Sequence, residues 1–466
     1  MVSNSSFIIN EAQIQGILSK QRPISALETR DILAKALGFK GLDLFDVAAL
    51  MTVTDKELLE EIFHAAAEVK KEIYGKRLVI FAPLYISNFC NNECLYCAFR
   101  AKNKELQRRA LTQPEIAAEV KCLIEQGQKR ILLVAGESYT GEGLQYVFDA
   151  IDTVYSVKSE HGEIRRVNVN VAPLTLEEFK KLKDAAIGTY QLFQETYHRD
   201  TYKEMHVAGK KADYDWRLTA IDRAMEAGID DIGIGILFGL ADPRFDVLAL
   251  LQHIAHLNDK FGIGPHTISI PRLEPALGSS LASAPPYLVS DDEFCKIIAI
   301  LRLAIPYTGI ILSTRETSDF RRRAFSLGIS QISAGSRTNP GGYGDVEKNS
   351  SVASQFSLGD HRLLDEVVRD VVEFGFMPSF CTACYRSGRT GEEFMALAKS
   401  GKIKNVCTPN ALVSFQEYLQ YYASPKTLEA GEKLIARELS SLPENQKQLV
   451  EKLLAKVRGG EGDVCV

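Results

Sequence analysis

The chain contains 466 residues, of which 45% are hydrophobic and 25% charged, and its formal net charge is −5. This composition is typical of a globular protein with two or three domains, or with one large barrel and extensions. No long basic block is present, which argues against nucleic acid and anionic membranes as partners, and no apolar run reaches the roughly 18 residues of a transmembrane helix.

The N-terminal residues and the cysteines indicate a cellular compartment. The first residues lack the basic and then apolar layout of a signal peptide. Nine cysteines in a chain without that signal argue against a disulfide scaffold and predict a reducing cytoplasmic location. Six of them fall into two sets. We expect Cys122 and Cys295 to pack within helices and Cys465 to lie in an unordered end.

Residues 1–75 are predicted to be helical, because apolar residues recur at helical spacing through segments such as 52–75. From Arg77 onward the pattern changes to short apolar runs separated by helical segments, one of which opens with the capping box Thr112-Gln-Pro-Glu115. The predicted strands are 77–90, 130–137, 165–173, 189–198, 231–240, 266–275, 307–316 and 328–342.

Eight strands that alternate with helices across about 265 residues predict an α/β fold, a (β/α)8 TIM barrel. The expected organisation is an N-terminal helical segment, the barrel and a C-terminal helical domain, over residues 1–75, 76–345 and 346–466. The last part is predicted to hold a helix over 359–375, polar turns, and a helical pair over 428–457. Chemistry in this fold lies at the C-terminal ends of the strands. Polar side chains predicted at those ends are Cys90, Glu137, Asn170, Glu195 and Glu274.

Two sets of three cysteines lie far apart in the chain. The first set, a C-x3-C-x2-C run directly after the first predicted strand, consists of Cys90, Cys94 and Cys97. The second set, a C-x2-C-x22-C run in the C-terminal part, consists of Cys381, Cys384 and Cys407. A structural zinc site normally closes with four ligands. Three thiolates per set therefore favour two iron–sulfur clusters, each with one iron left for a ligand other than protein; a zinc site or a redox cysteine cluster is the alternative.

The C-x3-C-x2-C loop after a barrel's first strand, with the aromatic Tyr96 before its last cysteine, resembles the radical S-adenosylmethionine (SAM) superfamily. The resemblance implies a [4Fe–4S] cluster held by the three thiolates. SAM would bind the fourth iron and be cleaved to a 5′-deoxyadenosyl radical.

Other segments resemble the SAM-binding positions of that superfamily. Ala135-Gly136-Glu137 resembles the segment that binds the SAM amino group, and Glu195 resembles the residue that contacts the ribose or methionyl part. Arg217 lies where relatives place an arginine on the SAM carboxylate; a salt bridge on a helix surface is the alternative for it. The residues expected to bind the cofactor are Tyr96, Gly136, Glu137, Asn170, Glu195 and Arg217.

The second cysteine set in a C-terminal extension resembles the tyrosine lyases of [FeFe]-hydrogenase maturation. The barrel also resembles the tyrosine lyases of thiazole synthesis, through segments such as 313–316 and 333–343, but these shorter chains lack the three-cysteine extension. The resemblance implies cleavage of the Cα–Cβ bond of L-tyrosine to p-cresol and dehydroglycine, which is then converted to CO and cyanide. An Fe(CO)(CN)-cysteine synthon would form at a second [4Fe–4S] cluster that carries an additional dangler iron and exogenous L-cysteine.

The same resemblance implies partners and alternatives. A reductant such as ferredoxin or flavodoxin would supply electrons, and hydrogenase maturation proteins would receive the synthon. A 2-iminoacetate synthase of thiazole biosynthesis and a non-catalytic iron–sulfur scaffold are the competing hypotheses. For the additional iron we expect His266 as a protein ligand, because a neutral imidazole suits Fe(II). Its place at the start of the sixth predicted strand lies away from the barrel mouth, and a satisfied loop histidine is the alternative.

Tyrosine needs a partner for its carboxylate and groups that can move protons. Arg272, Arg315 and Arg337 lie near the ends of strands six, seven and eight, and an arginine inside a barrel is costly without an anion. We expect at least one of them to bind the substrate carboxylate. Hydrogen bonds are expected from Ser269, with Ser313 and Ser336 as further candidates, and proton transfer from Glu274, with Glu316 and Tyr96 as alternatives.

Overall fold

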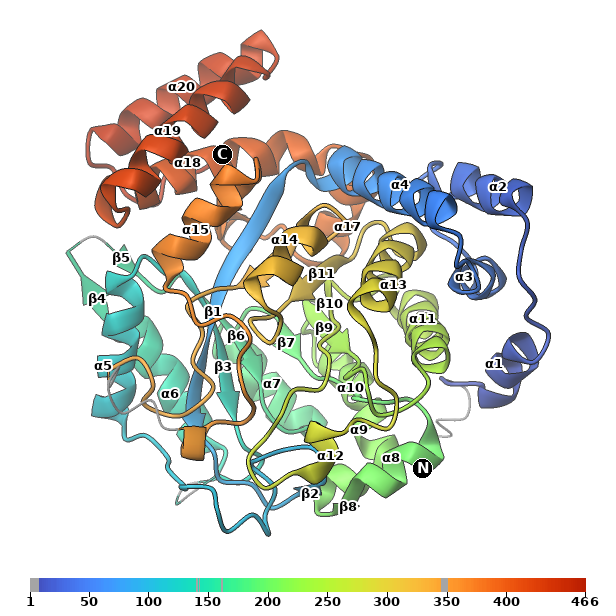
Figure 1. Cartoon of the computed structure of the whole chain (residues 1–466). Coiled ribbons are helices and arrows are strands. Elements are labelled where there is room, and N and C mark those ends of the chain that lie inside the picture. Colours follow the sequence, from blue (N-terminus) through green and yellow to red (C-terminus); the bar gives the residue numbers. More distant parts are fainter. Residues whose placement is uncertain (1–7, 140, 142, 161, 345–350) are drawn as a thin grey trace.

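The structure is a computed structural model that describes residues 8–139, 141, 143–160, 162–344 and 351–466. Its centre is a closed barrel of eight parallel strands surrounded by helices, as Figure 1 shows. The predicted α/β barrel is therefore confirmed. The predicted boundary between residues 345 and 346 lies outside the described residues, and the division into three domains stays a prediction.

The barrel closes because the first strand pairs with the last. The sheet order is β12-β11-β10-β9-β7-β6-β3-β1, and the parallel pairing of β1 with β12 completes the circle. These strands are β1 (Arg77–Ser87), β3 (Arg130–Ala135), β6 (Arg166–Asn170), β7 (Tyr190–Gln191), β9 (Ile232–Gly235), β10 (Thr267–Ser269), β11 (Gly309–Leu312) and β12 (Gln331–Ser333). Nearly every residue of β1 is buried, as expected for a parallel strand that is covered on both faces.

Each strand is shorter than the sequence pattern predicted, mostly at its C-terminal end. The fourth predicted strand, 189–198, contributes only the two residues of β7 to the sheet, and the eighth, 328–342, contributes three. Beyond these points the chain leaves the sheet and turns around the barrel mouth. The apolar runs continue there because the loops are buried against one another, so hydrophobicity alone does not mark the strand ends.

The helices between the strands cover the outside of the barrel. They are α5 (Gln113–Glu125), α6 (Gln145–Ser156), α7 (Leu176–Asp184), α8 (Arg199–Met205), α9 (Tyr214–Leu218), α10 (Ala220–Glu226), α11 (Pro243–Phe261), α12 (Ser280–Ser283), α13 (Asp291–Ala304) and α14 (Ser318–Phe325). Capping boxes start α5 at Thr112 and α7 at Thr175, as their sequences predict. Two short antiparallel ribbons join the loops, β2 (Glu93–Cys94) with β8 (His206–Ala208) and β4 (Lys158–Ser159) with β5 (Gly162–Glu163).

Four N-terminal helices pack on one side of the barrel: α1 (Glu11–Leu18), α2 (Ala26–Ala36), α3 (Leu44–Met51) and α4 (Lys56–Tyr74). Helix α4 packs on α13, and α1 and α3 pack on α11. The apolar residues that predicted a helix over 52–75 form the buried face of α4. Within the described ranges, no helix combines the length and the apolar character needed to cross a bilayer.

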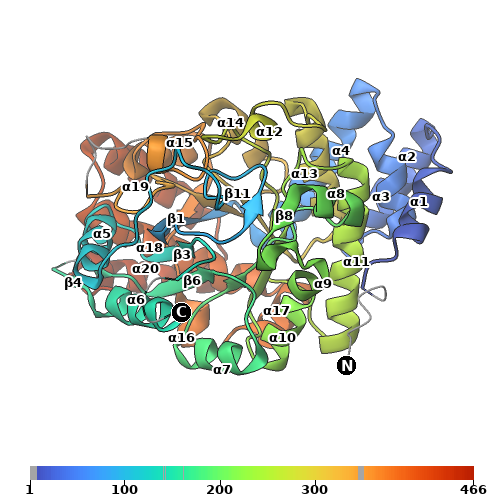
Figure 2. The ribbon, with the colours of Figure 1, turned by 90° about the horizontal axis from the view of Figure 1, so that it is seen from below.

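The C-terminal part contributes a strand as well as helices. β13 (Met377–Ser379) pairs in parallel with the N-terminal end of β1, with Arg77 opposite Met377. The helices are α15 (Leu364–Glu373), α16 (Ala383–Arg386), α17 (Gly391–Lys399), α18 (Ile403–Tyr421), α19 (Pro425–Ser440) and α20 (Glu444–Arg458). Helices α18, α19 and α20 lie together on the side of the barrel away from α1, α2 and α3 (Figures 1 and 2). The sequence predicted only helices and turns here, because a strand of three residues is too short to show a period of two.

Candidate functional site

The first cysteine set lies in a cavity at the C-terminal ends of the barrel strands. Cys90, Cys94 and Cys97 line this cavity together with residues of β3, β6, β7, β10, β11 and β12. The loop that carries them follows β1 directly, and Cys94 is fixed in the ribbon between β2 and β8. The buried side chain of Asn88 bonds to the backbone at Gln107 and Arg109, which holds the far end of the loop in place.

The three thiols fit an iron–sulfur cluster better than a single metal ion. All three are free of disulfides, and burial raises the pKa of Cys97 to about 11. Iron would stabilise the thiolate that burial disfavours. The backbone N–H of Asn92 donates to the Cys90 Sγ at 3.5 Å, and the side-chain amide of Gln355 donates to the Cys97 Sγ at 3.7 Å. In the part of the chain that the structure describes, no three His, Cys, Asp or Glu side chains converge closely enough for one metal ion.

Two carboxylates and two cations form a network beside the cysteines. Arg217 donates to the Glu137 Oε1 at 3.0 Å and lies 3.7 Å from the Glu195 Oε1, while Lys211 lies 2.6 Å from that oxygen. Burial opposes ionisation of Glu137, yet Arg217 and Lys211 keep the pKa of its carboxyl below the ordinary value. The Arg217 side chain is only 4% exposed, so it does not form the surface salt bridge that was its alternative.

Two backbone features bring this network to the cysteine loop. A Cβ on Gly136 would lie 2.2 Å from the carbonyl oxygen of Phe89, so only glycine allows the end of β3 to touch the loop. Glu195 lies in the loop after β7 and has a φ of 73°, a strained value for a residue with a side chain, and its carboxylate accepts from Lys211. The amide of Asn92 donates to the other Glu137 oxygen at 2.7 Å and ties that carboxylate to the loop.

Tyr96 is held by a histidine that the sequence did not reveal. The Tyr96 hydroxyl lies 2.8 Å from the His206 Nε2, and the His206 Nδ1 lies 2.8 Å from the carbonyl oxygen of Tyr202. Because a carbonyl only accepts, Nδ1 carries the proton and Nε2 accepts from the tyrosine. Burial lowers the pKa of His206 well below its usual range, which keeps the ring neutral. Asn92, His206 and Lys211 escaped prediction because each meets its partners only through the fold.

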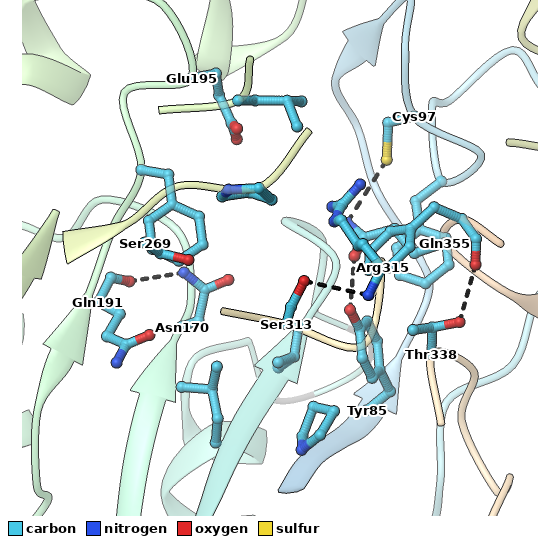
Figure 3. A pocket seen from close by; sticks show the side chains of 18 of the residues that line it. Tyr85, Cys97, Asn170, Gln191, Glu195, Ser269, Ser313, Arg315, Thr338 and Gln355 are labelled. Atoms are coloured by element: carbon cyan, nitrogen blue, oxygen red, sulfur yellow. Dashed lines mark hydrogen bonds between the residues drawn. The ribbon is translucent and has the colours of Figure 1, made fainter. Parts of the chain in front are cut away.

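Deeper in the same cavity, polar groups from several strands surround a space, as Figure 3 shows. Ser269 and Ser313 line it, and the Asn170 amide donates to the carbonyl oxygen of Gln191 at 2.7 Å. The Arg315 guanidinium stacks on the ring of Phe356 at 3.3 Å. Among the described residues it has no carboxylate partner, and burial lowers its pKa. An anionic ligand in the cavity would pair with the buried guanidinium and stabilise its charge.

Three of the predicted substrate residues do not line this cavity among the described residues. Arg272 forms ion pairs with Glu316 and, at 2.8 Å, with Asp291. Glu274 is half-buried beside Glu316, and burial together with that negative charge raises its pKa to about 7. Arg337 lines a neighbouring cavity. Of the five candidates for substrate binding, Ser269 and Arg315 lie in the first cavity.

The second cysteine set lies at the opposite, N-terminal ends of the strands. Cys381 follows β13, while Cys384 is on α16 and Cys407 on α18, and all three line one cavity with His266. His266 directly precedes β10 and therefore lies away from the barrel mouth, as the sequence predicted. This position places it beside the second cysteine set. The backbone N–H of Ala383 donates to the Cys381 Sγ at 3.4 Å.

Positive charge surrounds the second set. Arg77, Arg130 and Arg389 line the same cavity, and the Arg130 guanidinium donates to the carbonyl oxygen of Cys381 at 2.9 Å. Burial raises the pKa of the Cys381 thiol to about 12. Three thiolates add negative charge to a cluster, and the arginines would offset it, so these residues also fit an iron–sulfur cluster.

Comparisons with known proteins agree with this geometry. A family model described as the radical SAM superfamily matches residues 84–254, and one described as the biotin and thiamin synthesis associated domain matches residues 269–377. The 2-iminoacetate synthase of Escherichia coli K12 is 33% identical over 345 residues, which cover 74% of this chain and 88% of that protein. The chain belongs to the radical SAM superfamily, whose members bind SAM and a [4Fe–4S] cluster.

Within that superfamily the chain is similar along its full length to HydG. A crystal structure of HydG, described as a maturase of the [FeFe]-hydrogenase, has a TM-score of 0.95 and 48% identity and covers 98% of this chain and 100% of its own. The HydG maturase from Carboxydothermus hydrogenoformans has a TM-score of 0.84 and 43% identity, and covers 97% of this chain and 100% of its own.

Proposed function

We propose that this radical SAM enzyme is a lyase that cleaves the Cα–Cβ bond of L-tyrosine and assembles an Fe(CO)(CN)-cysteine synthon for [FeFe]-hydrogenase. The observation that carries the proposal is the pair of three-cysteine sets, one at each end of a single barrel. Full-length similarity to HydG supports it. The products are p-cresol and dehydroglycine at the first cavity, and CO and cyanide from the dehydroglycine.

In the first cavity the chain binds and orients two ligands. Cys90, Cys94 and Cys97 would hold the [4Fe–4S] cluster. When bound, the cluster and SAM supply a radical that abstracts a hydrogen atom from the substrate. Gly136 and Glu137 would hold the SAM amino group, Arg217 its carboxylate, and Glu195 its ribose or methionyl part. Asn170 and Tyr96 line the same space.

Arg315 is the arginine that we assign to the tyrosine carboxylate. It reaches into the cavity without a carboxylate partner among the described residues, whereas Arg272 is paired twice and Arg337 lines another cavity. Ser269 and Ser313 lie in the same lining and would donate hydrogen bonds to the substrate. A planar guanidinium suits a carboxylate because it can donate two parallel hydrogen bonds.

In the second cavity the chain would hold a second cluster and a cargo iron. Cys381, Cys384 and Cys407 leave one corner of a [4Fe–4S] cluster without a protein ligand, and exogenous L-cysteine would fill it. His266 lines the same cavity and would bind the dangler iron. A reductant such as ferredoxin or flavodoxin, and maturation proteins that accept the synthon, complete the proposal.

The test is anaerobic reconstitution of the whole chain with iron, sulfide, SAM, L-tyrosine, L-cysteine and a reductant. We expect 5′-deoxyadenosine, p-cresol, CO and cyanide. The second candidate, a 2-iminoacetate synthase, is favoured by the Escherichia coli relative. It predicts p-cresol without CO or cyanide. If no 5′-deoxyadenosine forms, both lyase assignments fail.

A further inference from the structure

A buried carboxylate at the second cavity has no role in the function described so far. Asp231 lies just before β9, lines this cavity, and has a side chain that is only 3% exposed. Within the described ranges, neither of its carboxylate oxygens has a hydrogen-bond partner. Burying a carboxylate without hydrogen-bond donors costs free energy, so a carboxylate in such a place calls for an explanation. The groups around it indicate its role.

The imidazole of His266 lines the same cavity and lies beside this carboxylate. The His266 Nδ1 lies 3.8 Å from the Asp231 Oδ2. Each residue directly precedes one of two neighbouring strands, β9 and β10, and the backbone N–H of His266 donates to the carbonyl oxygen of Ile232 at 2.9 Å. The imidazole also packs on the ring of Phe394 in α17, with centroids 4.3 Å apart. The ring is thus confined between a carboxylate and an aromatic face.

We propose that Asp231 is a positioning residue for His266, accepting its Nδ1–H so that Nε2 is free to bind the cargo iron. A histidine that binds metal through one ring nitrogen usually donates the N–H of the other to a carboxylate, carbonyl or water. The present separation of the His266 Nδ1 and the Asp231 Oδ2 is longer than a hydrogen bond. The proposed bond therefore requires these two atoms to approach by less than about 1 Å when His266 binds iron. This inference rests on the proposed role of His266.

Asp230 provides a matched control. It is the adjacent carboxylate in the chain, but it is exposed and accepts from the Thr390 Oγ1 at 2.9 Å. The variants are therefore Asp231→Ala, Asp231→Asn and Asp230→Asn in the full-length chain with both clusters reconstituted. Each is titrated anaerobically with Fe²⁺ in the presence of L-cysteine, and bound iron is measured. Protein labelled with [15N]histidine then gives the nitrogen coupling to the iron site by pulsed electron paramagnetic resonance.

We expect Asp231→Ala to weaken binding of the added Fe²⁺ by about 10- to 100-fold and to change the histidine nitrogen coupling. Asp231→Asn keeps an acceptor oxygen without the charge and should give a smaller change of the same kind. Asp230→Asn should match the wild type in both measurements. Wild-type affinity together with wild-type coupling in Asp231→Ala overturns the inference. If that variant does not fold, unchanged coupling in Asp231→Asn overturns it.

A fourth variant separates this inference from the function on which it rests. If His266→Ala binds the added Fe²⁺ as tightly as the wild type, the assignment of His266 fails and the role of Asp231 fails with it. If His266→Ala loses the iron while both Asp231 variants behave as the wild type, only the role of Asp231 is wrong.

Discussion

Two arginines, Arg315 and Arg321, differ in whether a carboxylate of the protein pairs with them. This difference separates an arginine that can bind a ligand from one that stabilises the fold. Arg321 is fully buried, but its Nη1 pairs with Asp360 and its Nη2 donates to the carbonyl oxygen of Ser333, so the protein itself supplies the counter-charge. Arg315 lines the first cavity with its guanidinium on the face of Phe356, and among the described residues no carboxylate forms an ion pair with it. A charge that the protein leaves unsatisfied is available to a ligand.

Replacing Arg315 with Gln should therefore weaken tyrosine binding rather than folding. Loss of a charged hydrogen-bonding partner is worth about 2–3 kcal/mol, which corresponds to a KM for tyrosine roughly 30- to 150-fold higher. The measurement is p-cresol formation as a function of tyrosine concentration. Arg323→Gln removes an exposed arginine paired with Asp292 and serves as the control. An unchanged KM in Arg315→Gln would show that another group binds the carboxylate.

Gly136 makes a second prediction at this scale. Gly136→Ala would place a methyl group 2.2 Å from the Phe89 carbonyl oxygen, so the end of β3 must move away from the cysteine loop. We expect unfolding free energy to fall by about 1–3 kcal/mol and iron at the first set to decrease. Urea unfolding and iron analysis measure the two effects. Gly16→Ala, in α1 with nothing within 4 Å of the added Cβ, should instead stabilise by about 0.5–1 kcal/mol.

At the scale of the elements, local patterns were predictable and long-range ones were not. The cysteine loop, the strand β1 and the capping boxes at Thr112 and Thr175 are encoded by neighbouring residues, and the structure contains them all. His206 contacts Tyr96, and the backbone N–H of Lys211 donates to the side-chain oxygen of Asn92, a residue more than 100 positions away in the sequence. No local periodicity marks such positions, nor the short strand β13.

Helix α11 carries a prediction that depends on pH. Its Asp246 is fully buried and accepts from the Tyr197 backbone N–H at 2.7 Å and from the Thr196 hydroxyl at 3.0 Å. Burial nevertheless raises the pKa of this carboxyl from 3.8 to about 7. The folded state therefore holds a proton that the unfolded state releases between these pH values, so unfolding free energy decreases as pH rises through this range.

Asp246→Asn removes this proton and should flatten the pH dependence. The variant should gain stability relative to the wild type as pH increases from about 4 to 7, by up to roughly 3–4 kcal/mol. Urea unfolding followed by circular dichroism at pH 5 and pH 8 gives the comparison. Glu293→Gln, a substitution of a half-buried carboxylate on α13, is the control. Parallel pH profiles for wild type and Asp246→Asn would contradict the prediction.

At the scale of the whole molecule, one barrel carries two separate sites. The first cavity lies where the strands end and the second where they begin, and the described residues that line one do not line the other. Similarity to HydG extends through both, whereas the match to the 2-iminoacetate synthase spans only 74% of the chain. A change confined to one site should therefore leave the chemistry of the other in place.

Cys384→Ser tests this independence. It removes one ligand of the second set, so about half of the cluster iron should be lost, together with the capacity to assemble the synthon. Formation of p-cresol should persist, because the first set is untouched. Iron analysis and chromatographic detection of p-cresol give the two readings. Cys122→Ser, on α5 and outside both cavities, should retain all of the iron. Loss of p-cresol in Cys384→Ser would show that the sites are coupled.

The pairing of β13 with β1 has a consequence for biosynthesis. Arg77 lies opposite Met377, so this pairing joins residues 300 positions apart, and Cys381 lies just beyond it. Contacts of such long sequence separation form late. The first cysteine set is complete within eight consecutive residues, while the second needs this pairing and then Cys407 on α18. On the ribosome the first set emerges long before the second exists, and iron in the second set would report that synthesis of the barrel and its extension is complete.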